Sequence, residues 1–393
     1  MNTTTLILGG GFGGIVTANT LRELLPAEHK IILIDKNSTF HIGATKTWIM
    51  LGERTPEQVT RNLSALSSRG IEFIQAEVQK IDPVKRKVVT SKKTFHGDFL
   101  VLALGADMNL GKIPGLRLGE PGLEAAAETF YTLEGALRLR EILPKFDRGE
   151  LVTLIPATPF KCPPGPYEAA MLLHEYFTKR GHRGNIKLSV HTVEPRPMAT
   201  AGPQMGQFIR EELQKRDIHL ATEKRCKNVD GAKRLINFED GSTAPFDLLI
   251  AIPPHEAPQA IREAGLTDAS GWIPVDPKTL KTSVDRVYAI GDLCKVPLPG
   301  RFKPEMPLVL PKAGVFAEAH GRVVAHQIAA AALGQISPEV YDGKGYCYIE
   351  MGDRQAVRGD GEFFTLPHPQ MTAQPADLAQ KQAWAEEWVR RYL

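Results

Sequence analysis

Short apolar runs alternate with stretches of helical periodicity along most of the chain. The first run covers residues 3–8, and apolar residues then recur at helical spacing from Ile15 to Leu25, where Pro26 ends the pattern. A second apolar run, over residues 30–34, follows directly. Strands that alternate with helices in this way predict a parallel sheet covered by helices.

The same alternation returns in the middle of the chain, which predicts a second unit of similar layout. Its expected elements are a strand at 151–156, a helix at 166–180, a strand at 185–194, a helix at 205–216 and further strands at 218–221, 234–238 and 246–252.

Residues 98–106 form an apolar strand that ends in a glycine turn and suits the centre of a parallel sheet, and residues 287–292 form an apolar strand that ends in Gly-Asp. Because the second of them follows the middle unit, we expect the chain to return to its first sheet. The fold class is therefore α/β, with two Rossmann-like three-layer domains and a C-terminal strand and helix. The expected bounds are 1–115 and 272–335 for the discontinuous first domain, 116–271 for the second domain and 336–393 for the C-terminal segment.

Three less regular segments lie in the first half of the chain. We interpret residues 36–48 as a polar loop and residues 56–67 as an amphipathic helix. Residues 78–95 are rich in Lys and Arg and predict a small antiparallel insert.

The C-terminal segment begins with an expected strand at 345–350. The Pro- and Gln-bearing residues 367–375 indicate a link to a final helix at 376–393. Trp384, Trp388 and Tyr392 recur every four residues in that helix. This stripe predicts either a membrane-surface contact or a face packed on the body of the protein or on a partner chain, such as a second copy in a homodimer.

The turn after the first strand carries the strongest motif. Gly9, Gly11 and Gly14 have the G-x-G-x-x-G spacing, and Asp35 ends the second strand about 20 residues further on. The first glycine permits a tight turn, the second lets a pyrophosphate approach the backbone, and the third lets the helix pack closely. Asp35 would accept hydrogen bonds from a ribose hydroxyl. We expect dinucleotide binding here, with Gly13 and Lys36 in the same candidate set.

Composition narrows the class of protein. The 393 residues carry a formal net charge of +3, with 42% hydrophobic and 24% charged residues, which gives no reason to expect nucleic-acid binding. No apolar run is long enough to span a bilayer. The first strand begins within a few residues of Met1, so we expect no signal peptide and a cytoplasmic protein, peripheral on the cytoplasmic face of a membrane if the aromatic stripe is a contact surface.

The turn in the middle unit differs from the first turn. Residues 157–168 read Ala-Thr-Pro-Phe-Lys-Cys-Pro-Pro-Gly-Pro-Tyr-Glu, and their prolines lack the N–H groups that a pyrophosphate needs. We therefore expect no nicotinamide dinucleotide there. Cys162 precedes a helix, where the dipole would lower its pKa and favour the thiolate, and Glu168 would be a proton acceptor or donor in the first helical turn. The structural alternative for Cys162 is a small buried hydrophobe.

The remaining candidates lie at strand and helix ends. Gly105 follows an apolar strand, and Gly291 and Asp292 end another, where a carboxylate can accept bonds from sugar or ribityl hydroxyls. Lys312 opens a long helix. Of the other cysteines, we expect Cys226 on an exposed turn and Cys294 packed behind the cofactor. No metal site is predicted.

Together these motifs resemble the FAD-binding signatures of the two-dinucleotide-domain flavoprotein reductases. Residues 161–168 are similar to the signature of sulfide:quinone oxidoreductases and of the flavoprotein subunit of flavocytochrome c sulfide dehydrogenase. The resemblance implies FAD as cofactor, with Asp292 on its ribityl chain and Lys312 at the pyrimidine end of the ring. It also implies a redox pair that oxidises sulfide, with Cys162 as sulfur carrier and Cys347 facing the flavin, and a quinone as electron acceptor.

Departures from that family keep alternatives open. Many sulfide:quinone oxidoreductases have a third cysteine upstream, but residues 124–133 contain none. The alternatives are a sulfide dehydrogenase flavoprotein that reduces a cytochrome, an NADH:quinone-type flavin reductase, and a non-enzymatic redox sensor that uses Cys162 and Cys347 as a switch disulfide. The prolines of the second turn count against the reductase.

Overall fold

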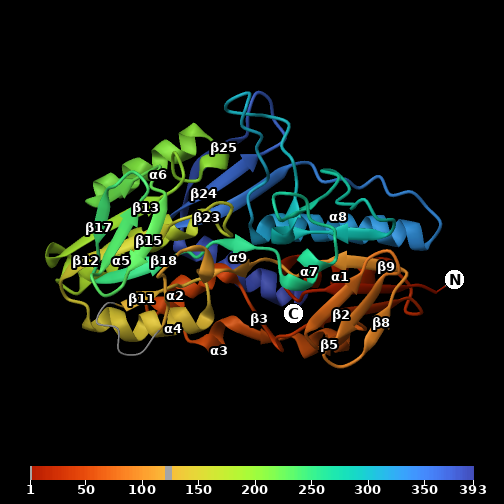
Figure 1. Cartoon of the computed structure of the whole chain (residues 1–393). Helices are drawn as coiled ribbons and strands as arrows, with labels where there is room; N and C mark the ends of the chain where they lie inside the picture. Colours follow the sequence, from red (N-terminus) through yellow and green to blue (C-terminus); the bar gives the residue numbers. More distant parts are fainter. Residues whose placement is uncertain (1, 120–125) are drawn as a thin grey trace.

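The first of two five-stranded parallel sheets is formed by both ends of the discontinuous unit that the sequence predicts (Figure 1). The computed structural model describes residues 2–119 and 126–393. The strand order is β21 (Val287–Ala289), β9 (Phe99–Leu102), β1 (Thr4–Leu8), β2 (Lys30–Asp35) and β5 (Glu72–Gln75). β1 lies at the centre because Leu6, Ile7 and Leu8 have no polar face and are fully buried.

Two layers cover this sheet. Helix α1 (Phe12–Leu24) packs on β1 and β2, and the long helix α8 (Gly314–Ala332) packs against α1. The helices approach so closely that a Cβ on Gly321 would lie 2.6 Å from the carbonyl oxygen of Gly13. The predicted antiparallel insert is confirmed as β6 (Val78–Asp82), β7 (Lys87–Thr90) and β8 (Thr94–His96).

The second sheet has the order β11 (Ala126–Glu128), β18 (Leu248–Ala251), β12 (Gly149–Ile155), β13 (Ile186–Thr192) and β14 (Ile218–Ala221). Helices α4 (Leu133–Ile142), α5 (Gly165–Lys179) and α6 (Pro203–Lys215) belong to this unit. An antiparallel sheet of β15 (Cys226–Asp230), β16 (Leu235–Phe238) and β17 (Thr243–Pro245) packs on it through a separate apolar cluster that includes Leu154 and Ile236. This three-layer arrangement is the expected one.

Short elements join the two units. β10 (Asp107–Met108) of the first unit pairs with β19 (His255–Glu256) of the second. β20 (Ile273–Pro274) and β22 (Cys294–Lys295) pair with each other within the first unit. The short helix α7 (Gln259–Glu263) follows β19. The strand order reverses at β1 in the first large sheet and at β12 in the second. Ligands of open α/β sheets bind where the strand order reverses, at the carboxyl ends of the strands.

The C-terminal segment forms a third structure between the two units, in blue in Figure 1. β23 (Lys344–Gly352), β24 (Gln355–Glu362) and β25 (Gln370–Asp377) form an antiparallel sheet, and α9 (Leu378–Tyr392) follows. The predicted link at 367–375 is therefore wrong, because most of it is a strand. Pro375 lies in β25, which is an edge strand, and an edge tolerates a residue without an N–H.

The aromatic stripe of α9 faces the protein body. Trp388 and Tyr392 are 4% and 3% exposed, and the indole of Trp388 donates a hydrogen bond to Glu318 and packs on Phe12. Trp384 donates to the hydroxyl of Tyr346. Of the two predicted roles, the stripe has the packing role, so it offers no aromatic face to a membrane. No helix within 2–119 and 126–393 is both long and apolar enough to cross a bilayer.

Two predictions in the first unit are wrong. The expected helix at 56–67 is a single turn, α3 (Pro56–Val59), followed by β4 (Thr60–Asn62) and a 3₁₀ helix, Leu63–Arg69. The expected polar loop at 36–48 contains β3 (Thr39–His41), which pairs with β4, and leads into α2 (Lys46–Met50). The pairing between β3 and β4 takes residues that a local pattern would place in a helix or a loop.

Candidate active site

The glycine turn after β1 forms an open cradle at the N-terminus of α1. Gly9 has a φ of +111°, and a Cβ there would lie 2.2 Å from the carbonyl oxygen of Ala103. A Cβ on Gly14 would lie 1.9 Å from the oxygen of Gly9. Gly11 differs, because nothing lies within 4 Å of its Cβ position. The first and third glycines are thus required by packing, whereas the second faces open space suited to a pyrophosphate.

Asp35 stands at the far side of this turn. Its carboxylate accepts hydrogen bonds from the N–H groups of Gly10, at 2.6 Å, and Asn37, at 2.7 Å. Lys36 beside it is exposed, and a Cβ on Gly13 would meet Ile290 at 2.8 Å, which gives Gly13 a packing contact. Gly105, at a φ of +71°, also has open space at its Cβ position.

Asp292 supplies an unsatisfied acceptor in the next part of the wall. It follows β21, and its Oδ1 atom is buried without a hydrogen-bond partner among the described residues. Burial raises the pKa of Asp292, while the ammonium of Lys312 opposes that shift. Lys312 is 5% exposed, donates to the backbone oxygen of Asp292 and lies over Trp272. A buried carboxylate oxygen without a donor fits a ribityl hydroxyl, so the residues present fit FAD.

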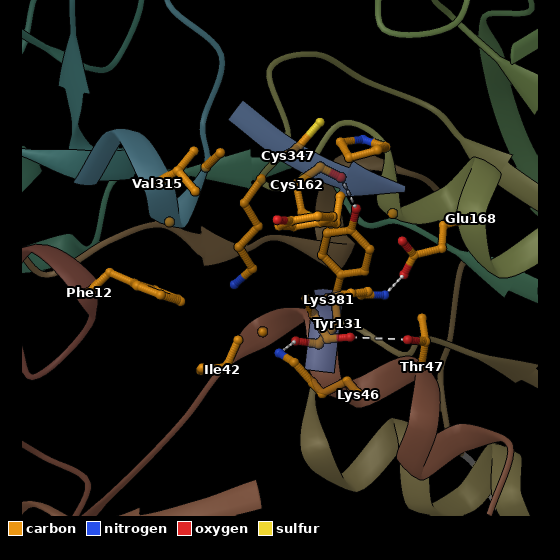
Figure 2. Close-up of a pocket in the computed structure, with 18 of the residues that line it drawn as sticks. Phe12, Ile42, Lys46, Thr47, Tyr131, Cys162, Glu168, Val315, Cys347 and Lys381 are labelled. Atoms are coloured by element: carbon orange, nitrogen blue, oxygen red, sulfur yellow. Dashed lines mark hydrogen bonds and ion pairs between the residues drawn. The ribbon is translucent and has the colours of Figure 1, made fainter. Parts of the chain in front are cut away.

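Cys162 and Cys347 come from distant parts of the chain and line one cavity of about 260 Å³ (Figure 2). Cys162 lies in the turn after β12, and Cys347 lies in β23. Both are free thiols. The cavity also reaches Phe12 and Gly314, at the N-termini of α1 and α8, and Asp292, so the two cysteines face the same space as the candidate cofactor residues.

The backbone of Cys162 is tightly held. Its φ is +56°, a region that non-glycine residues rarely adopt and that costs about 1–3 kcal/mol. Its N–H donates to the oxygen of Lys312 at 2.8 Å, and its own oxygen accepts bonds from the N–H of Gly165 at 2.9 Å and the hydroxyl of Tyr131 at 3.2 Å. These hydrogen bonds therefore hold Cys162 in an unfavourable backbone conformation.

The predicted low pKa of Cys162 is wrong. Burial raises its pKa to about 11, and the negative charge of Glu168 adds to the shift, although α5 begins only three residues later. Burial likewise raises the pKa of Cys347 to about 12, with a further contribution from Cys162. Desolvation outweighs the helix dipole here, so both groups rest as thiols at neutral pH.

Glu168 belongs to a buried cluster of charges that includes a residue the sequence analysis missed. The ammonium of Lys381, 1% exposed, lies 2.8 Å from Glu168 and 2.9 Å from Glu350. Glu168 also accepts the N–H of Glu350 at 3.0 Å, and Glu350 accepts the indole N–H of Trp48 at 2.9 Å. Burial raises the pKa of Glu168, which places a group able to hold a proton beside the cysteines.

Other candidates lie apart from the cavity. Cys294 is buried, and its thiol contacts the oxygen of Gly291 at 3.2 Å, which confirms its expected packing role. Cys226 is not on an exposed turn but begins β15, where it packs half-buried on an apolar cluster. Neither cysteine lines the cavity that Cys162 and Cys347 share.

A second, apolar cavity of about 200 Å³ adjoins the first and shares Cys347 and Tyr346 with it. Phe363 lines this cavity, and prolines of the second turn and of residues 307–311 form much of its wall.

Comparison with known proteins shows which family the chain resembles. The profile of the family described as pyridine nucleotide-disulphide oxidoreductase matches residues 3–313. The chain is 27% identical to the mitochondrial sulfide:quinone oxidoreductase of Mus musculus over 303 residues, which are 74% of this chain and 66% of that protein. It is 28% identical to the sulfide-quinone reductase of Aquifex aeolicus over 334 residues, 82% of this chain and 75% of the relative.

The solved structure of the sulfide:quinone oxidoreductase from Aquifex aeolicus has the same fold. The TM-score is 0.85 at 22% sequence identity, and the match covers 99% of this chain and 91% of that one.

Proposed function

Because the chain belongs to the pyridine nucleotide-disulphide oxidoreductase family, we propose that it is an FAD-dependent enzyme that oxidises sulfide and passes the electrons to a quinone. The observation that carries the proposal is the convergence of Cys162 and Cys347 on one cavity with the unpartnered carboxylate oxygen of Asp292. The relatives named as sulfide:quinone oxidoreductases support the choice of substrate and acceptor.

In the first step, hydrosulfide attacks the Cys162 sulfur of a Cys162–Cys347 disulfide. The sulfur–sulfur bond between the cysteines breaks, a new bond forms to the incoming sulfur, and Cys347 leaves as a thiolate. The products are a persulfide on Cys162 and a thiolate on Cys347, so charge and atoms balance. The hydrogen bond from the backbone N–H of Gly359 favours this thiolate, because it lowers the pKa of Cys347.

In the second step, the persulfide sulfur bonds to Cys347. A trisulfide forms, and two electrons and one proton are released. Glu168 is the candidate acceptor for the proton, since it lines the cavity and burial raises its pKa. A further hydrosulfide can then attack the trisulfide, so the sulfur chain grows until a polysulfide leaves.

A bound FAD would supply the acceptor for the two electrons and the route by which they reach the quinone. The glycine turn and Asp35 would hold the adenosine diphosphate part of FAD, Asp292 would accept a hydrogen bond from its ribityl chain, and Lys312 would contact its ring. Tyr346 and Phe363 are candidates to contact the quinone, whereas Phe364 packs on Tyr341 outside both cavities. Because quinones dissolve in lipid, this acceptor would bring the enzyme to a membrane surface by a face other than the buried stripe of α9.

Anaerobic addition of sulfide to the FAD-loaded protein tests the proposal. Sulfide should bleach the flavin absorbance, and added quinone should restore it over many turnovers. Reduction that quinone cannot reverse would indicate a redox sensor. Recovery with a cytochrome but not with a quinone would indicate a sulfide dehydrogenase.

NADH should fail to reduce the flavin rapidly. The turn after β12 presents Pro159, Pro163, Pro164 and Pro166 where a second dinucleotide would need glycines and free N–H groups. Stopped-flow absorbance with micromolar NADH checks this expectation, with sulfide as the matched reductant. Flavin reduction by NADH as fast as by sulfide would favour the NADH:quinone reductase instead.

Alanine at Gly11 should weaken FAD binding without destabilising the protein. Its Cβ would meet no protein atom within 4 Å and its φ is −88°, so the change is tolerated by the fold, but the methyl group enters the space assigned to the pyrophosphate. We expect a rise in the FAD dissociation constant of at least about tenfold, since lost hydrogen bonds to a charged group are worth about 1.5–3 kcal/mol.

Fluorescence titration of the apoprotein with FAD measures this rise, and thermal unfolding of the apoprotein measures stability. Gly184→Ala is the matched control, because Gly184 is exposed and also has open space at its Cβ position. Unchanged FAD affinity in Gly11→Ala would show that the cofactor binds elsewhere.

A further inference from the structure

Three lysines line the first cavity, and two of them lack a carboxylate partner. Lys381 is paired with Glu168 and Glu350. Lys46, at the start of α2, and Lys161, next to Cys162, form no ion pair within the described ranges 2–119 and 126–393. The Nζ atom of Lys46 donates to the backbone oxygen of Tyr131 at 2.7 Å, in the lower part of Figure 2.

The two lysines act on each other electrostatically. Burial and then the positive charge of Lys161 lower the pKa of Lys46 to about 7, and Cys162 opposes that shift. Such mutual repulsion between ammonium groups in a partly buried wall is unfavourable unless an anion lies between them.

The two neighbouring histidines carry no charge that affects the charge of Lys46 and Lys161. His41 of β3 faces Lys46, and burial and Lys46 lower its pKa to about 4. His255 of β19 faces Lys161, and burial followed by Lys161 lowers its pKa to about 3. Both rings are therefore neutral at physiological pH, and neither ring nitrogen of His255 has a hydrogen-bond partner among the described residues. Two acids act on the lysines without forming an ion pair with them among the described residues: Glu134 of α4, which is exposed, acts on Lys46, and the buried Asp292 interacts with Lys161.

We propose that Lys46 and Lys161 form a binding site for a small monovalent anion in the cavity wall that they share with Cys162. The choice of hydrosulfide as the occupant in turnover rests on the proposed function. Binding there selects the ionised form of sulfide, which is the nucleophile that the first step requires, and holds it in the same cavity as the sulfur it attacks. Neutral hydrogen sulfide gains nothing from the two charges.

Titration calorimetry with sodium thiocyanate, in a halide-free buffer at pH 6, tests the site in the FAD-loaded protein. The wild-type protein should bind thiocyanate, and Lys46→Met and Lys161→Met should each weaken binding by at least about tenfold, as loss of a charged hydrogen-bond donor does. Lys46→Arg should retain most of the affinity. Lys187→Met is the matched control, since Lys187 is 82% exposed on β13. Affinity should fall as the pH rises above about 7, because Lys46 loses its charge.

Two results would overturn the site: unchanged thiocyanate binding in the folded Lys46→Met and Lys161→Met variants, or binding only to protein stripped of FAD. The site and the proposed function can fail separately. Sulfide oxidation by a wild-type protein that does not bind thiocyanate would remove the anion site and leave the function. Thiocyanate binding that requires both lysines, in a protein that does not oxidise sulfide, would remove the function and leave the site.

Discussion

Serine at Cys162 or at Cys347 should lower the rate of sulfide oxidation by at least about 10³-fold, as loss of a nucleophile does in other enzymes. A hydroxyl cannot carry persulfide sulfur or exchange with a disulfide, so either change removes the redox pair. FAD should remain bound in both variants, because neither side chain contributes to the glycine turn or to Asp292. Anaerobic stopped-flow measurement of flavin bleaching by sulfide, followed by steady-state turnover with quinone, checks both statements.

The other two cysteines provide matched controls. Cys226→Ser should leave the rate unchanged, because the side chain packs in β15 away from the cavity. Cys294→Ser should lower stability more than rate, since the buried thiol would be replaced by a hydroxyl that needs hydrogen bonds. Substantial sulfide:quinone activity in either Cys162→Ser or Cys347→Ser would refute the proposed chemistry.

Methionine at Lys381 should cost about 3–5 kcal/mol of the free energy of unfolding, the usual effect of removing one partner from a buried ion pair. The change leaves Glu168 and Glu350, 4% and 3% exposed, facing each other without a cation. Urea denaturation measures the loss. Lys179→Met is the control, because Lys179 pairs with Glu175 at the surface and should change stability by less than about 1 kcal/mol.

The pH dependence of this variant has a defined sign. Burial raises the pKa of Glu168 in the folded protein, and removal of the Lys381 charge raises it further. A carboxyl group with a raised folded pKa favours folding while it is protonated, so its contribution is lost as the pH rises above the usual range of a glutamate. Lys381→Met should therefore lose stability between acidic and neutral pH, and adding Glu350→Gln should recover part of it. A variant as stable as the wild type at neutral pH would contradict this account.

The parts of the fold that sequence reasoning predicts well depend on local signals. The turn from Gly9 to Gly14 and the strands beside it follow from backbone geometry and apolar runs, which neighbours in sequence determine. The failure at residues 56–67 has a physical cause. Leu63 and Leu66 are both fully buried, and a spacing of three residues aligns side chains in a 3₁₀ helix as well as in an α-helix. Strand β4, which precedes this 3₁₀ helix, forms through its pairing with β3.

In the candidate site, too, local sequence predicts some features, whereas others depend on residues distant in the chain. Residues 161–168 indicate a reactive cysteine, but the pKa of Cys162 depends on burial and on Glu168, which outweigh the helix dipole. Lys381 could not be assigned to the site, because its partners are distant in the chain. One signal was available: Leu378, Lys381, Ala385, Trp388 and Tyr392 follow helical spacing, which places a lysine on the buried face of α9.

The position of Lys381 on α9, the last helix, also determines when the buried charge cluster can be completed during translation. Glu168 and Lys381 are 213 residues apart in the sequence. During translation, the glycine turn and Cys162 are therefore made long before the lysine that pairs with Glu168. Until α9 has emerged from the ribosome, the two carboxylates near the cysteines lack their cation. A chain interrupted before residue 378 would therefore contain both cysteines and the nucleotide-binding unit, but it would leave Glu168 and Glu350 without the ammonium that pairs with them.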